Sequence, residues 1–96
     1  MGRRTAPESL WPPLDEVTAR AHAGELRELA TEHGITNLRF ASAGRLVGTA
    51  GDDETYDGIG FEVAAQGLLH ADVMLIADRV LARPGASQDL VAASPL

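Results

Sequence analysis

Acidic side chains gather in one short stretch of this 96-residue chain, where they could bind a metal ion. Glu62 follows a run of loop acids: Asp52, Asp53, Glu54 and Asp57. Carboxylate oxygens are the hard ligands that Mg²⁺ prefers in proteins. A strand predicted over residues 58–65 would place Glu62 on the same face as Gly58 and Gly60, because alternate residues of a strand point to one side. The other interpretation is a solvated acidic loop, which is what such runs usually form.

A second stretch, residues 38–45, has the sequence Leu-Arg-Phe-Ala-Ser-Ala-Gly-Arg. Together with the segment after the acidic loop, it resembles the core of the minimal nucleotidyltransferases, the smallest members of the DNA polymerase β-like superfamily. That family's pattern is a strand, then Gly-Ser-x-x-Arg-Gly opening a helix, then Asp-x-Asp on the next strand. Ser42 and Arg45 stand at the serine and arginine positions, whereas Gly58 and Gly60 stand at the two aspartates.

The resemblance implies a site for ATP and Mg²⁺. Ser42 and Arg45 would bind the nucleotide phosphates, and Asp72 would be the family's third acid. In this chemistry two Mg²⁺ ions clamp the attacking and leaving oxygens of the transferred phosphoryl group. Glycine supplies no metal ligand, so we expect the chain not to perform the reaction. The remaining candidates are Glu62 and Asp72 as catalytic residues and metal ligands, with Asp57 as a further metal ligand.

The family also places a helix between its second strand and the strand that carries the third acid. Residues 64–71 are too few for such a crossover, so we predict a tight antiparallel hairpin there, which would redirect Asp72. Missing carboxylates and a missing crossover together indicate the family's shape without its chemistry.

Apolar spacing and turn residues predict the elements around these segments. We expect one helix over residues 14–33, a strand over 35–41, a short helix over 42–47, strands over 58–65 and 71–77, and a helix over 86–93. The order predicts an α+β domain over residues 14–96 with a small mixed three-stranded sheet and flanking helices, nucleotidyltransferase-like in arrangement. Residues 1–13 are predicted to be a flexible lead from which Trp11 folds back over the domain.

Composition narrows the classes of function. The net charge of −6 and pI of about 4.8 disfavour direct binding to a nucleic-acid backbone. Because the chain has no cysteine, it has no thiol nucleophile or zinc-thiolate site, and no apolar run is long enough to cross a bilayer. All its lysine-or-arginine residues are arginine, which suggests a high-GC bacterial genome, and we expect a cytoplasmic protein. The scattered His22, His33 and His70 are expected at caps and on the surface.

Three functions remain open from the sequence. The first is a catalytically impaired nucleotidyltransferase-like antitoxin or regulator that binds a helical HEPN-type toxin, with residues 73–76 and the acidic surface facing a basic partner. The second is an active Mg²⁺-dependent enzyme that transfers AMP to a protein through a relocated carboxylate site. The third is a non-enzymatic interaction module, such as a homodimer that pairs edge strands. We expect a protein partner, either a HEPN-type toxin or a second copy of the chain, and an oligomeric assembly.

Overall fold

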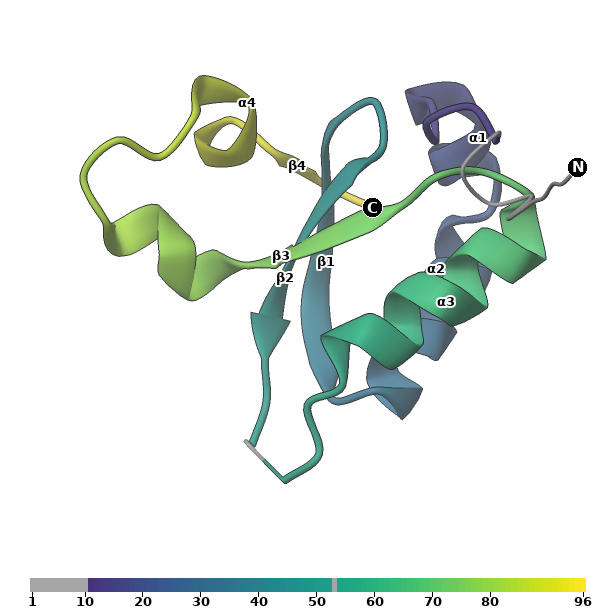
Figure 1. Ribbon diagram of the computed structural model, residues 1–96, viewed down its shortest axis with the longest axis horizontal. Coiled ribbons are helices and arrows are strands. Elements are labelled where there is room, and N and C mark those ends of the chain that lie inside the picture. The colour runs from purple at the N-terminus through teal and green to yellow at the C-terminus, as the bar shows by residue number, and fades with distance from the viewer. Residues whose placement is uncertain (1–10, 53) are drawn as a thin grey trace, which may run out of the picture.

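A computed structural model describes residues 11–52 and 54–96, and Figure 1 shows an α+β domain built around a mixed sheet of four strands. The strand order is β3-β2-β1-β4. In Figure 1 the strands lie between α1, α2 and α3 on one side and α4 with the short 3-10 helix η2 on the other. The elements are α1 Glu16–Ala21, α2 Ala23–Glu32, β1 Ile35–Ser42, β2 Arg45–Ala50, α3 Gly58–Leu69, β3 Met74–Ala77, η2 Asp78–Ala82, α4 Gln88–Val91 and β4 Ser94–Pro95.

The predicted helix over residues 14–33 is two helices that meet at His22. Asp15 caps α1 by accepting a hydrogen bond of 2.7 Å from the Thr18 amide. His22 ends α1 and begins α2, and Gly24 lies in the first turn of α2, where its low helix propensity fits a break. Val17 of α1 points to solvent and is 81% exposed.

A hairpin replaces the predicted short helix over residues 42–47. Ser42 at the end of β1 pairs with Arg45 at the start of antiparallel β2, which leaves a two-residue turn. The second turn residue, Gly44, has a φ of 75°, a conformation that favours glycine. The helix prediction was wrong because residues 46–48 are buried in the sheet, and a helix would have removed them from it.

The predicted strand over residues 58–65 is wrong, because this segment forms most of helix α3. Asp57 caps that helix by accepting a hydrogen bond of 2.9 Å from the Gly60 amide. Phe61 and Ala65, four residues apart, are fully buried against the sheet. Gly58 therefore lies in the first helical turn, and it does not share a strand face with Gly60.

Helix α3 is also the crossover helix whose absence was predicted from the sequence. It connects β2 to β3, which pair in parallel with Arg45 opposite Met74 and Gly48 opposite Ala77. The antiparallel hairpin predicted over residues 64–71 is therefore wrong. The predicted count of three strands is also wrong, because the two-residue β4 pairs with Arg39 and Phe40 of β1.

One apolar core lies between the sheet and helices α1 to α3. The side chains that fill it, all at most 9% exposed, are Leu14, Ala19, Leu26, Ala30, Ile35, Leu38, Phe40, Leu46, Phe61, Ala65, Ala71, Val73 and Leu75. Leu38 and Phe40 of β1 point into this core. The core holds β1, β2 and β3 against α3, so it fixes the ends of the strands where the candidate site residues lie.

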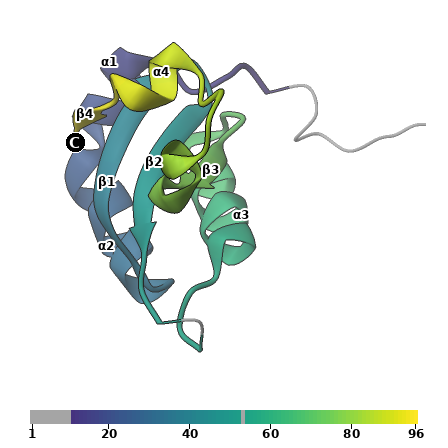
Figure 2. The ribbon, with the colours of Figure 1, turned by 90° about the vertical axis from the view of Figure 1, so that its left-hand side faces the viewer.

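Trp11 folds back onto the domain, as predicted. Its ring stacks on His70, with centroids 5.1 Å apart, just past the end of α3. The chain next to it is held by backbone hydrogen bonds from the Asp72 amide to the Pro12 carbonyl and from the Leu14 amide to the Asp72 carbonyl. Figure 2 shows the path of this segment alongside the domain. Residues 1–10, the rest of the predicted lead, lie outside the described residues.

Two glycine-to-alanine substitutions test the fold in opposite directions. A Cβ at Gly67 of α3 would meet nothing within 4 Å, so Gly67→Ala is expected to raise the free energy of unfolding by about 0.5–1 kcal/mol through helix propensity. A Cβ at Gly48 of β2 would lie 2.5 Å from the Cγ2 of buried Ile35, so Gly48→Ala is expected to lower it by about 1–3 kcal/mol. Urea denaturation measures both, and equal effects of the same sign would contradict this arrangement.

Candidate functional site

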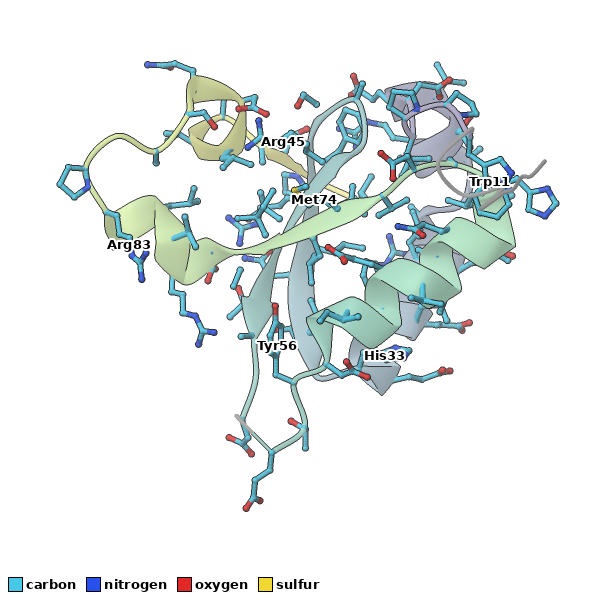
Figure 3. The ribbon with its side chains drawn as sticks, in the orientation of Figure 1. Trp11, His33, Arg45, Tyr56, Met74 and Arg83 are labelled. Atoms are coloured by element: carbon cyan, nitrogen blue, oxygen red, sulfur yellow. The ribbon has the colours of Figure 1, made fainter. Side chains whose placement is uncertain are left out.

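Ser42 and Arg45, the predicted phosphate-binding residues, lie together at the tip of the β1–β2 hairpin. The structure adds a third member, Asp89 of α4. The Ser42 hydroxyl donates a hydrogen bond of 2.6 Å to Oδ2 of Asp89, and Nη1 of Arg45 lies 3.2 Å from the same oxygen. Nη2 of Arg45 also donates to the hydroxyl of Ser87, at 3.4 Å. Figure 3 shows Arg45 beside α4.

Within this cluster, the charges of Arg45 and Asp89 balance each other. The hydrogen bond from Ser42 lowers the pKa of the Asp89 carboxyl most, followed by a hydrogen bond from Ser87 and the charge of Arg45. Asp89 is therefore ionised at neutral pH and neutralises Arg45. A phosphate group would have to compete with this carboxylate for both Ser42 and Arg45, because a carboxylate already accepts from each of them.

Glu62, the first catalytic candidate, supports the edge of the sheet. Its Oε2 accepts a hydrogen bond of 2.7 Å from the amide of Leu75, on strand β3. One turn later on α3, Nε2 of Gln66 donates to the carbonyl of Val73 at 2.9 Å. Together Glu62 and Gln66 satisfy backbone groups on the side of β3 that no strand covers, which is a position where another chain could otherwise add a strand.

The other two metal candidates occupy separate positions. Asp57 caps the start of α3, and Asp72 has an exposed side chain in the segment before β3. Across residues 11–52 and 54–96, no three His, Cys, Asp or Glu side chains are grouped so that they could hold a metal ion. Asp53, another acid of the loop, lies outside the described residues. The structure thus brings Ser42 and Arg45 together but does not gather the carboxylates around them.

Sequence reasoning missed two aspartates that organise the face of the sheet near η2 and α4. Asp89 is one, and its partner Ser42 is 47 residues away in sequence, so no local pattern marks the contact. The other is Asp78, whose Oδ2 accepts from Nη2 of Arg39 at 2.9 Å and from the Thr49 hydroxyl at 2.6 Å. Asp78 follows directly after the apolar strand β3, and a polar residue at a strand's end was the available signal.

Removing the Ser42 hydroxyl is expected to raise the pKa of Asp89 toward its usual value, because that hydroxyl makes the largest contribution to lowering it. A lowered folded-state pKa stabilises the fold above the ordinary carboxyl pKa, and this contribution is lost as pH falls through the lowered value. Ser42→Ala should therefore destabilise the fold at neutral pH and much less in acid. NMR titration of the Asp89 carboxyl measures the shift.

Ser94→Ala is the matched control for Ser42→Ala, because the Ser94 hydroxyl, on β4, accepts a hydrogen bond from Nη2 of Arg20 and forms none with Asp89. This control should leave the Asp89 titration unchanged. Identical curves for Ser42→Ala and the unsubstituted chain would exclude the proposed cause of the shift.

A second substitution separates structural from catalytic use of Glu62. Glu62→Ala leaves the amide of Leu75 without its acceptor and is expected to lower the free energy of unfolding by about 1–2 kcal/mol. Glu62→Gln keeps an acceptor oxygen and should cost less. The control is Glu28→Ala, which removes an exposed glutamate on α2 and should stay within about 0.5 kcal/mol. Urea denaturation would refute the edge role if Glu62→Ala were as mild as Glu28→Ala.

No family model, no curated protein and no solved structure matches the chain. In the part of the chain that the structure describes, no helix is both long enough and apolar enough to pass through a membrane.

Proposed function

We propose that this chain acts by binding another protein, on a nucleotidyltransferase-like frame that does not transfer nucleotides. The observation that carries the proposal is the composition of β2. In the family that the sequence resembles, the second strand bears the Asp-x-Asp pair that holds the metal ions. The second strand here, Arg45–Ala50, contains neither aspartate nor glutamate. Gly58 and Gly60, which the resemblance aligns with that pair, lie in helix α3, so neither these positions nor β2 supplies a carboxylate in place of the metal-binding pair.

The order of elements after β2 supports the same frame. A helix, α3, separates the second strand from the third, as the family pattern requires. The helix expected between the first two strands is absent from the described residues, because the two-residue turn after Ser42 leaves no room for it.

The phosphate-binding positions support a non-catalytic role as well. Ser42 and Arg45 both bind Asp89 within the chain. In an active enzyme these side chains would be directed at a nucleotide, where the developing negative charge is stabilised. With an internal carboxylate in that place, the hairpin tip is bound to α4, and its polar groups contribute to the fold.

The partner class follows from the resemblance. Small bacterial proteins of this family pair with helical HEPN-type toxins, and a member without catalysis would neutralise its toxin by occupying it. The chain's net charge of −6 suits a basic partner. Self-association through sheet edges is less well supported, because Glu62 and Gln66 already bind the backbone at the β3 edge.

Residual catalysis, the second candidate function, would need Glu62 to leave the Leu75 amide and join Asp72 at a metal ion. The test is label transfer. The purified chain is incubated with ATP labelled at the α-phosphate, with Mg²⁺ or Mn²⁺, and with a candidate HEPN-type toxin. The expected result is no label on either protein, together with restored growth when the two are co-expressed. Growth should also be restored by the Arg45→Ala chain.

Transfer of label that Asp72→Ala abolishes would overturn the non-catalytic proposal. Calorimetric titration of ATP and Mg²⁺ onto the chain alone gives an independent check. No saturable heat is expected, and a saturable heat that disappears in Arg45→Ala would show that the hairpin tip holds a nucleotide in spite of Asp89.

A further inference from the structure

The outward half of α3 carries no polar side chain. Ile59, Val63 and Leu68 are 75%, 63% and 44% exposed. At 3.6 residues per turn, the positions between them on the same half of the helix are Gly60, Ala64 and Gly67. The helix's one charged residue, Glu62, is directed to the β3 edge. A helix at the surface of a protein normally presents charged or polar residues to water, so this face is unusual.

A groove runs along this face where α3 packs against α2. Its volume is about 360 Å³, and its lining residues are Glu25, Glu28, Leu29, Glu32, Ala64 and Leu68. The apolar part comes from Leu29 of α2 and from Ala64 and Leu68 of α3. The glutamates all come from α2. Figure 1 shows α3 in front of α2 along this side of the domain.

The three glutamates form an acidic rim along one side of the groove, because residues spaced by three, four and seven lie on the same side of a helix. Glu25 is paired with His22. Within the described residues, Glu28 and Glu32 form no ion pair, and no arginine lines the groove. Arg27, the cation of α2, donates instead to the carbonyl of Leu96, away from the groove.

We propose that this groove binds a basic amphipathic helix of a partner protein. Apolar side chains at three- and four-residue spacing on that helix would cover Leu68 and Ala64, and its lysine or arginine side chains would face the glutamate rim. The inference rests on the proposed function for the existence of a partner, and it adds the surface and the chemistry of the bound segment. It is a different contact from residues 73–76, of which Val73 and Leu75 are buried and Met74 is exposed.

Charge selects this occupant over two others. A second copy of the chain, related by a two-fold axis through α3, would bring two glutamate rims together without compensating cations. An anionic membrane surface would likewise be repelled by the rim, although an apolar helix face could otherwise lie on lipid. A basic helix satisfies both the apolar and the acidic part of the groove.

The test uses a synthetic amphipathic peptide with a leucine stripe flanked by lysines, and an otherwise identical peptide with glutamates in place of the lysines. Each is titrated onto the isotope-labelled full chain and followed by NMR. The expected result is saturable binding of the lysine peptide alone, weaker at high salt, with shifts concentrated on α2 and α3. Leu68→Lys should weaken that binding at least about tenfold, because it removes an apolar contact and adds a repelling charge.

Val17→Lys is the matched control. Val17 lies on α1, is 81% exposed, and receives the same added charge away from the groove. It should leave the affinity within about twofold, because only long-range screened charge changes. Both variants replace exposed side chains, so circular dichroism should show unchanged folding for each. Glu28→Gln should weaken the lysine peptide and reduce its salt dependence.

Four outcomes would overturn the proposal: equal binding of the two peptides, shifts away from α2 and α3, equal weakening by Val17→Lys and Leu68→Lys, or sedimentation that shows a dimer dispersed by Leu68→Lys. Failure here is distinguishable from failure of the proposed function. Label transfer to a toxin would refute the non-catalytic role but not the groove. Absence of peptide binding would refute the groove but not the non-catalytic role, which rests on the lack of carboxylates in β2.

Discussion

The parallel pairing of β2 with β3 is the constraint on which the rest of the structure depends. Parallel neighbours cannot be joined by a tight turn, so the chain must travel the length of the sheet and return. Helix α3 makes that return, and its burial of Phe61 and Ala65 holds the crossover against the strands. The helix then brings Glu62 to the edge of β3 and turns Ile59 and Val63 outward. The Glu62 contact at the sheet edge and the apolar face both follow from this one connection.

The sequence predicted the α+β class, β1, and the region of the first helices, because these segments have a single clear periodicity. It failed at residues 58–65, where two periodicities compete. Ile59, Phe61 and Val63 alternate as in a strand, while Phe61, Ala65 and Leu69 recur every four residues as in a helix. The Asp57 cap and the core around Phe61 decide for the helix, and the core is a tertiary effect that a local pattern does not contain.

Part of the candidate site was also predictable from the sequence, and part was not. The proximity of Ser42 and Arg45 was predictable, because only two residues separate them. Their engagement by Asp89 was not, because it depends on how the C-terminal segment returns to the hairpin. Polar residues that could serve chemistry instead serve the fold: Asp57 begins a helix, Glu62 supports a strand edge, and Asp78 joins β1 to β2 through Arg39 and Thr49. These structural roles oppose a catalytic role, because a carboxylate that already accepts a hydrogen bond within the chain is less available to bind a metal ion.

At both outer strands of the sheet, side chains form hydrogen bonds with backbone groups. At β3 these are Glu62 and Gln66, and at β4 the guanidinium of Arg20 donates to the Pro95 carbonyl, while Pro95 itself has no amide to offer. Exposed strand edges are the usual starting points for intermolecular β-aggregation. The backbone groups that these side chains bind are therefore not available to pair with another chain. Substitutions at Arg20 or Glu62 would thus expose backbone groups at a sheet edge and are expected to lower the solubility of the chain at high expression.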